Sequence, residues 1–413
     1  MRLRGKSVKA GSVFRRCTVA GVALAASMAI AACSTGSADG PGDDRAAAGL
    51  AVTAADSEPG AKEPEPDPAP EVSVEDGARN VDPFTPVTVT SLGEGLETVT
   101  MTNEVGYVVQ ETLSADGKVW SSDETLGYNR TYTIEALDMN GKTTTVTFTT
   151  PEATGTASAA LGPLDGSTVG VGQTVAVRFS QPIQDRKAAQ GAIEVKASPE
   201  VEGAFYWLND YEVRWRPQHL WESGTEVEVN ANIRGVDLGG GIRGDGNYST
   251  SFTIGERVIS IVDDETKTMK VYRNKKLLRE IPVSLGTDNT RWATPNGRYI
   301  VGDMHQQLTM DSETFGYSHE EGGYRTDVNY ATQLSYSGIY VHGAPWSVWA
   351  QGNTNQSHGC INMTDEDAAW FQSISQRGDI VRVKNTTAGY LPVSDGLGDW
   401  NLSWEKWSEG NAD

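Results

Sequence analysis

The sequence predicts a mainly β protein made of consecutive domains, and three observations support this fold class. Short runs of alternating apolar and polar residues recur along most of the chain, with Gly-, Asp- and Asn-containing turns between them. Only one segment combines helical periodicity with a capping pattern. The first 80 residues hold an apolar run and then a Pro-, Ala- and acid-rich stretch that cannot bury a core.

Residues 1–32 have the pattern of a lipoprotein signal peptide. Six basic residues come first, and an apolar run from about Val19 then closes in Ile30-Ala31-Ala32-Cys33. After cleavage, Cys33 would carry the lipid that holds the protein on the outer face of the membrane. A plain signal peptide with an incidental cysteine is the alternative. No other stretch is long and apolar enough to span a membrane, so we expect membrane contact through this lipid anchor only.

The next segment, residues 33–80, is expected to be a disordered tether, because it is rich in Pro, Ala and acidic residues and poor in aromatic ones. The formal net charge is −21, and it would fall to −27 when the signal peptide removes its six positive charges. So much negative charge argues against a nucleic-acid partner. The acidic residues are spread along the chain, which is typical of a solvated surface.

Two immunoglobulin-like sandwiches are expected after the tether, at residues 81–153 and 154–254. The first contains alternating runs such as Thr131 to Leu137 and Thr143 to Thr149, with an Asn-Gly turn between them. The second contains runs such as Thr174 to Phe179. Neither carries a constellation of ligands. A calcium loop from Asp237 to Asp245 is conceivable, but a plain turn is favoured because it has too few acidic side chains.

A third β-rich unit is expected at residues 255–384, with one helix. Thr364 and Asp367 form a capping box ahead of an apolar run, and Gly378 would stop the helix. The segment from Gly302 to Tyr330 has no clear period and is long enough to be a lid. Residues 385–413 are expected to be an extension that packs on this unit. Its tryptophans would share one face of a helical turn, and they are Trp400, Trp404 and Trp407.

The chemistry of this unit centres on Cys360, which would be the only thiol left after maturation, because Cys17 leaves with the signal peptide and Cys33 is lipidated. An unpaired thiol in an oxidising compartment suggests a functional role. Such a thiol needs a base. His342 ends a predicted strand and is favoured for this role over His358, which stands two residues before the cysteine and would need a bent backbone to reach it.

The stretch Tyr336-Ser337-Gly338-Ile339-Tyr340-Val341-His342-Gly343-Ala344-Pro345-Trp346-Ser347, followed by Ser357-His358-Gly359-Cys360-Ile361-Asn362, resembles the active-site motif of the L,D-transpeptidases, whose catalytic domain is of the YkuD type. The resemblance extends to the mycobacterial and related actinobacterial members. It includes the lipidation motif Ile30-Ala31-Ala32-Cys33, the tether, the two sandwiches and the tail Gly396-Leu397-Gly398-Asp399-Trp400. It therefore covers nearly all of the mature chain.

This resemblance implies a β-rich catalytic fold and the cross-linking of peptidoglycan between two tetrapeptide stems. Cys360 would attack the third-position diamino acid of a donor stem, expel D-Ala and pass the acyl group to a second stem, giving a 3→3 link. His342 would act as base, oriented by the carbonyl of Gly343, where the family often has serine. The other implied site residues bind the oxyanion or substrate or shape the pocket, and they are Tyr324, Gly359, Ser337, Gly338, Asn362, His358 and Trp346.

The resemblance further implies inhibition by carbapenem-type β-lactams, and neither a cofactor nor a metal is expected. Three other classes of protein could carry a Cys/His pair of this kind. A sortase would need an essential arginine such as Arg377 or Arg382. A papain-like hydrolase usually places its cysteine before its histidine, the reverse of the order found here. A non-catalytic wall-binding lipoprotein would be free to lose Cys360 and His342.

Overall fold

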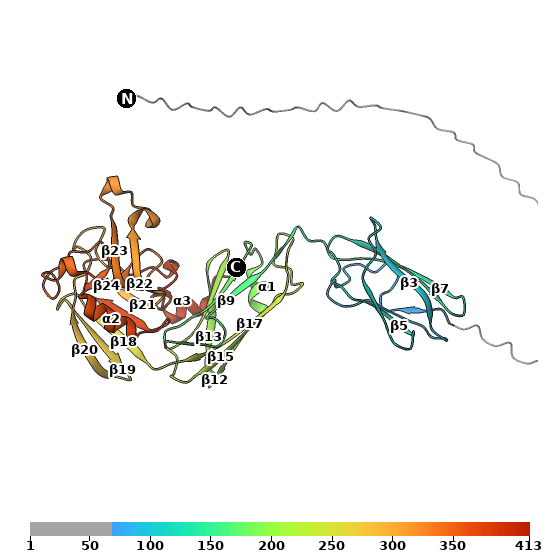
Figure 1. Ribbon diagram of the computed structural model, residues 1–413, viewed down its shortest axis with the longest axis horizontal. Helices are drawn as coiled ribbons and strands as arrows, with labels where there is room; N and C mark the ends of the chain where they lie inside the picture. The colour runs from blue at the N-terminus through green and yellow to red at the C-terminus, as the bar shows by residue number, and fades with distance from the viewer. Residues whose placement is uncertain (1–67) are drawn as a thin grey trace, which may run out of the picture. The chain divides into compact units, whose positions relative to one another are not determined.

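The computed structural model describes residues 68–413, shown in colour in Figure 1. The predicted signal peptide, Cys33 and the tether up to residue 67 lie outside the described residues. The described part is mainly β, as predicted, with 26 strands and three α-helices. None of these helices is long and apolar enough to cross a membrane.

The first sandwich consists of two sheets around an aromatic core. Tyr132 and Phe148 stack in this core with ring centroids 5.7 Å apart, and the buried Trp120 packs with them. One sheet has the order β1(Glu71–Val72), β2(Thr88–Thr90), β5(Val119–Ser122), β4(Glu111–Leu113), and the other has the order β3(Leu96–Asn103), β6(Thr131–Asp138), β7(Thr143–Thr149).

The expected end of the tether at residue 80 is too late. The strand Glu71–Val72 pairs antiparallel with β2, and the Thr144 hydroxyl donates to the Pro70 carbonyl at 2.6 Å. The Pro-rich composition concealed this short edge strand, which is held by pairing to residues far along the chain.

The second sandwich packs two four-stranded sheets around Trp207, Trp215 and Trp221. A short helix, α1(Arg186–Gly191), was not predicted. Its cap is Asp185, whose side chain accepts from the Ala188 N–H. The strand orders are β10(Ser167–Val169), β17(Asn247–Ile254), β15(Glu226–Asn232), β12(Ile193–Ser198) and β13(Gly203–Asn209), β14(Glu212–Pro217), β11(Val175–Phe179), β9(Ala159–Gly162), with β8(Gly155–Ala157) paired to β16(Ile242–Gly244).

In the Asp237 loop, protein groups already bind the carboxylate. Asp237 accepts from the Gly239 N–H at 3.0 Å and from Arg243 at 3.4 Å. These contacts are those of a turn closed by its own side chain, the interpretation favoured from the sequence.

The third unit, called the catalytic unit because it carries the motif around Cys360, spans residues 255–384 and contains two sheets, with helix α2(Asp365–Ile374) packed against β23 and β24 (Figure 1). The capping pattern predicted for α2 is confirmed, because the Thr364 side chain accepts from the Asp367 N–H at 3.1 Å. The strand orders are β20(Lys276–Pro282), β19(Thr268–Arg273), β18(Val258–Asp263), β26(Ile380–Lys384), β21(Gly297–Ile300) and β22(Met304–Asp311), β23(Arg325–Gln333), β24(Tyr340–Gly343), β25(Ile361–Met363).

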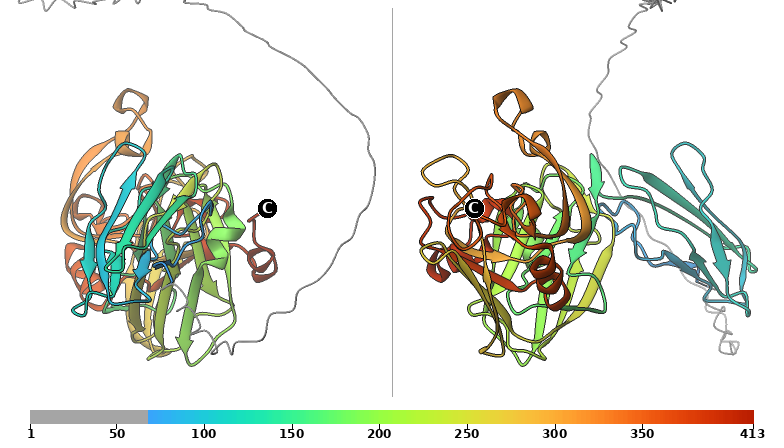
Figure 2. Two further views of the ribbon diagram at one scale, coloured as in Figure 1. Left: turned by 90° about the vertical axis from the view of Figure 1, so that its right-hand side faces the viewer. Right: turned by 60° about the vertical axis from the view of Figure 1, so that its left-hand side comes forward.

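The segment from Gly302 to Tyr330, which has no clear period in the sequence, is mostly the long hairpin β22–β23. Two short 3₁₀ helices, Ser312–Phe315 and His319–Glu321, form its tip. Figure 2 shows this hairpin, in orange, projecting from the rest of the catalytic unit in both views. Polar residues on both faces of an extended hairpin hide the period of two that usually identifies strands.

The C-terminal extension differs from the prediction in two ways. Trp400 lies in a separate 3₁₀ turn, Asp399–Asn401, ahead of α3(Trp404–Glu409), so the three tryptophans do not share one helical face. The extension also packs on the second sandwich and not on the catalytic unit alone. The buried Trp407 stacks on Tyr206 at 5.1 Å and donates to the Ala204 carbonyl at 2.8 Å.

Candidate active site

The parallel pairing of β24 with β25 brings Cys360 and His342 to one edge of a sheet. His342 is opposite Asn362, and Val341 is opposite Ile361. Cys360 immediately precedes β25 and is buried, with 4% of its surface exposed. Its sulfur accepts from the Tyr340 N–H at 3.4 Å and donates to the Gly338 carbonyl at 3.5 Å. The thiol is therefore held between two backbone groups of the segment leading into β24.

His342 has one ring nitrogen committed to the backbone. Nδ1 lies 2.8 Å from the Gly343 carbonyl, which can only accept, so Nδ1 carries the hydrogen and Nε2 is the basic nitrogen. Burial lowers the pKa of His342 below its ordinary value, while the Gly343 carbonyl and the charge of Asp365 act in the opposite direction. The neutral, basic form of His342 is therefore favoured at neutral pH.

Cys360 is difficult to ionise in this environment. Burial raises the pKa of its thiol to about 12, and the hydrogen bond from the Tyr340 N–H offsets only part of this effect. At neutral pH the thiol thus carries its proton. A nucleophilic role for this cysteine requires a base that removes the proton as the attack occurs.

Two neighbouring cavities, one of them lined by Cys360, together collect every predicted site residue of the catalytic motif except Gly343. One, of about 290 Å³, is lined by Cys360, His342, Asn362, Trp346, Tyr324 and His358. The other, of about 220 Å³, is lined by Ser337, Gly338, Gly359, Tyr324 and His358. Tyr324 and His358 line both cavities and therefore form the wall between them. Gly343 contributes through its carbonyl, which accepts a hydrogen bond from His342 Nδ1.

His358 is held between two aromatic rings. Its ring centroid lies 4.7 Å from that of Tyr324 and 4.8 Å from that of Trp292, edge to face. Burial and the nearby Arg291 lower its pKa. Trp292 and Arg291 were not identified from the sequence, because they belong to a loop without a pattern and reach the site only through the fold. This packing makes His358 a wall of the site.

Tyr324 lies near the tip of the hairpin and faces Cys360. Burial, and then the proximity of Cys360, raise the pKa of its phenol far above the ordinary value. Its backbone exchanges hydrogen bonds with Ser312 at 2.9 and 2.8 Å, which fixes the start of β23. Tyr324 therefore offers a protonated hydroxyl to the site.

The turn that carries the nucleophile is closed by Ser357. Its hydroxyl donates to the Cys360 carbonyl at 2.6 Å and accepts from the Gly359 N–H at 3.1 Å. Gly359 has φ +122°, a conformation that favours glycine. The Gly359 N–H, which the resemblance implies as a helper at the oxyanion, donates to Ser357 in this structure.

The two candidates for the arginine of a sortase mechanism lie elsewhere. Arg377 forms an ion pair with Asp303. Arg382 lines a separate cavity of about 490 Å³ together with Arg257 and Arg298. Neither arginine lines the cavities at Cys360, so the geometry gives no support to the sortase alternative.

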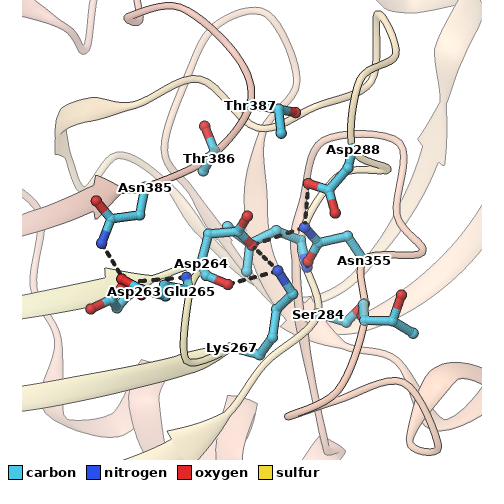
Figure 3. Close-up of polar contacts among 12 residues, drawn as sticks. Asp263, Asp264, Glu265, Lys267, Ser284, Asp288, Asn355, Asn385, Thr386 and Thr387 are labelled. Carbon is cyan, nitrogen blue, oxygen red and sulfur yellow. Dashed lines mark hydrogen bonds and ion pairs between the residues drawn. The ribbon is translucent and has the colours of Figure 1, made fainter.

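A polar cluster braces the loop that leads to Cys360, and Figure 3 shows its members. The Asn355 amide donates to Asp264 and to Asp288, at 2.8 Å in each case, and its oxygen accepts from the Leu285 N–H at 3.0 Å. Asp264 also binds Lys267 at 2.9 Å. Asn355 and Asp264 are each 3% exposed. One buried amide therefore connects three segments behind the nucleophile.

Replacing Asn355 with alanine is expected to destabilise the catalytic unit by about 1–3 kcal/mol, because the buried Asp264 carboxylate, the partly buried Asp288 carboxylate and the Leu285 N–H each lose a hydrogen bond. Denaturant unfolding followed by tryptophan fluorescence measures this change. The surface variant Asn353→Ala, which loses one exposed bond to the Trp349 carbonyl, should stay within about 0.5 kcal/mol of the parent. Equal effects of the two substitutions would show that the cluster does not brace the loop.

The comparisons with known proteins agree with this fold. The protein-family model for the L,D-transpeptidase catalytic domain matches residues 257–383. The family model for a bacterial Ig domain matches residues 78–237. These matches define the class of the protein: a β-rich enzyme of the L,D-transpeptidase type, with Ig-like structure ahead of its catalytic domain.

The chain belongs to the L,D-transpeptidase family. It is 50% identical to L,D-transpeptidase 2 of Mycobacterium tuberculosis over 344 residues, which cover 82% of this chain and 84% of that protein. It is 33% identical to L,D-transpeptidase 5 of the same species, over 84% of this chain and 78% of the relative. A solved L,D-transpeptidase in complex with imipenem is 33% identical and matches 55% of this chain and 99% of its own, with a TM-score of 0.48. The protein is an L,D-transpeptidase that cross-links peptidoglycan.

Proposed function

We propose that Cys360 forms a thioester with the donor stem and that the product is a 3→3 cross-link. The sulfur attacks the carbonyl of the third-position diamino acid, a C–S bond forms, and the C–N bond to the terminal D-Ala breaks. The thiol proton passes through His342 to the departing amine. In the second half-reaction the side-chain amine of another stem attacks the thioester, gives its proton to His342, and the thiol is restored.

The observation that carries this proposal is the contact between His342 Nδ1 and the Gly343 carbonyl, which fixes the tautomer of His342. Its Nδ1–H is bound to the Gly343 carbonyl at 2.8 Å, so the basic Nε2 is left for the thiol. Both side chains line the same cavity. A base is needed, because the pKa of Cys360 is raised to about 12 by burial.

The proposed oxyanion donors are the Cys360 N–H and the Tyr324 hydroxyl. Such donors stabilise the charge that develops as the carbonyl is attacked. Tyr324 suits this role because burial raises its pKa and keeps the phenol protonated. The Gly359 N–H is bound to Ser357 and is assigned no direct part.

The donor stem is proposed to contact Asn362, Ser337 and Gly338. Asn362 donates to the Ser347 hydroxyl at 3.1 Å, while its side-chain oxygen is buried with no hydrogen-bond partner among residues 68–413. An unpartnered buried acceptor beside the nucleophile suits an amide N–H of a peptide. Because Ser337 and Gly338 line the other cavity, the stem would pass the wall formed by Tyr324 and His358.

Carbapenem-type β-lactams are proposed to acylate Cys360, and most penicillins to do so poorly. The supporting comparisons are a relative in complex with imipenem and L,D-transpeptidase 3 of Mycobacterium tuberculosis in complex with a faropenem-derived adduct. The strained lactam carbonyl would take the place of the peptide carbonyl, and the same base and oxyanion donors would act on it.

The family acts on peptidoglycan, which implies an extracytoplasmic location. We propose that the protein is held at this location by a lipid on Cys33. The tether and the Ig-like part would act as spacers between the membrane and the catalytic unit. The sequence pattern from Val19 to Cys33 supports this proposal.

The test is a product analysis. A soluble form that lacks residues 1–33, incubated with a disaccharide-tetrapeptide, should release D-Ala and form dimers joined between two diamino acid residues. Tandem mass spectrometry of the dimer identifies the link. Dimers joined through D-Ala, or release of D-Ala with water as the only acceptor, would contradict the proposed transfer.

A further inference from the structure

Gly343 stands directly beside the carboxylate of Asp365, which is distant in sequence from the strand. A β-carbon on residue 343 would overlap Asp365 Oδ1 and lie 3.2 Å from the Asp365 α-carbon. The carboxylate thus occupies the space that a side chain at position 343 would need. Position 343 is also the residue whose carbonyl holds His342, at 2.8 Å.

The fold fixes Asp365 in this place. It is the first residue of α2, directly after the cap residue Thr364, and α2 packs against β24. Its Oδ2 accepts from the Asn329 amide on β23 at 3.0 Å. Its Oδ1 is buried and has no hydrogen-bond partner among the described residues. A buried carboxylate oxygen without a partner is costly, and in a functional site such a cost often accompanies a role in chemistry.

The charged and titratable groups around His342 are few. Cys360 comes from the turn before β25 and Asp365 from α2, while Tyr324 and His358 line the same cavity. Asp365 is the one of these whose charge acts on His342, where it raises the pKa of the imidazole against the effect of burial. On the same helical turn, Asp367 is engaged with Arg279 and Thr364, and Glu366 is exposed.

We propose that Asp365 is a positioning residue for His342: its carboxylate fills the space left by Gly343 and stabilises the imidazolium that forms when His342 takes the thiol proton. This proposal rests on the proposed function of His342 as the base. In the step it concerns, one proton moves from Cys360 Sγ to His342 Nε2, which creates a thiolate and an imidazolium. A negative charge behind the imidazole lowers the energy of this charged pair.

The first test replaces Asp365 with asparagine, which keeps the shape and removes the charge. We expect the pKa of His342 to fall by about one unit, and the rate of Cys360 alkylation by iodoacetamide at neutral pH to fall about tenfold, since less of the charged pair is present. The acid limb of the pH–rate profile should move to lower pH. Histidine-selective NMR follows the pKa, because the chain has five histidines and His342→Gln assigns the signal.

The matched control is Glu366→Gln, the same change of charge on the neighbouring, exposed residue of the same helical turn. Like Asp365→Asn, it removes one negative charge from the first turn of α2 and from the protein as a whole. It should change neither the pKa of His342 nor the alkylation rate. An unchanged His342 titration in Asp365→Asn, or an equal shift in Glu366→Gln, overturns the proposal. Iodoacetamide needs no stem peptide, so this result is separate from any failure of the transpeptidase reaction.

A second pair of variants tests the contact itself. Gly343→Ser should displace the carboxylate and lower the pKa of His342 when Asp365 is present. When Asp365→Asn is already in place, the same substitution should produce little further change, because the charge has already been removed. Fully additive shifts, or no shift in Gly343→Ser, would show that the two residues do not act together.

Discussion

Replacing Cys360 with alanine is expected to abolish both D-Ala release and dimer formation, with a loss of at least about 10³-fold. Without the sulfur no thioester can form, and residues 68–413 contain no other cysteine that could replace it. Liquid chromatography with mass spectrometry of the reaction with disaccharide-tetrapeptide measures both products.

The alanine variant should fold normally, because it removes only a small buried group, and its circular dichroism and melting transition should resemble those of the parent. Cys360→Ser provides a second comparison with nearly the same volume. A hydroxyl is a much weaker nucleophile than a thiol, so this variant too should be severely impaired. Dimer formation by a folded Cys360→Ala variant would disprove the assignment of the nucleophile.

Replacing His342 with alanine is expected to slow acylation of Cys360 by about 10²–10⁴-fold. Burial raises the pKa of the thiol to about 12, so hardly any thiolate exists at neutral pH without a base. The pH dependence distinguishes this cause from a loss of structure. Below the thiol pKa, the variant should react about tenfold faster for each added pH unit. The parent should instead be level through neutral pH, because burial lowers the pKa of His342 and keeps it neutral there.

His358→Ala is the matched control, because it removes a second imidazole from the same cavity. Its ring packs between Tyr324 and Trp292, so we expect at most a tenfold effect and a level pH profile like that of the parent. A large loss in His358→Ala with little change in His342→Ala would reverse the assignment of the base.

Local sequence patterns predicted the elements that present the site. Alternation along the strand that ends at His342 puts Val341 and Tyr340 on opposite faces. In the structure Val341 packs in the main core of the catalytic unit, while Tyr340 packs with Cys360. The cap of α2 at Thr364 was likewise visible, because it depends on residues three apart.

What the sequence could not predict depends on contacts between distant segments. Trp292 reaches His358 across 66 positions of the chain, a separation that no local pattern records. The engagement of the Gly359 N–H by Ser357 depends on the exact turn that the backbone adopts. The closeness of Asp365 to Gly343 follows from the packing of α2 on β24. In the sequence, Gly343 stands out only because the family often has serine at that position.

The packing of the C-terminal extension was also beyond local inference. Tryptophan spacing suggested a helical face but could not identify the surface that it covers. That surface contains Arg216, whose guanidinium lies 4.6 Å from the rings of both Trp400 and Trp407. Arg216 comes from β14 of the second sandwich. Because β14 is far from the extension in the sequence, no local pattern identifies it as the surface that the extension covers.

Peptide mapping of the acylated protein shows whether one buried cysteine, Cys360, forms the acyl-enzyme. The soluble parent is treated with a carbapenem, and in parallel with disaccharide-tetrapeptide under rapid acid quench, and each adduct is located by mass spectrometry. We predict one adduct per chain in each case, on the peptide that contains Cys360, with the mass of the intact carbapenem or of the stem minus D-Ala. An adduct on any other residue, or an unmodified Cys360 while products accumulate, would contradict the account.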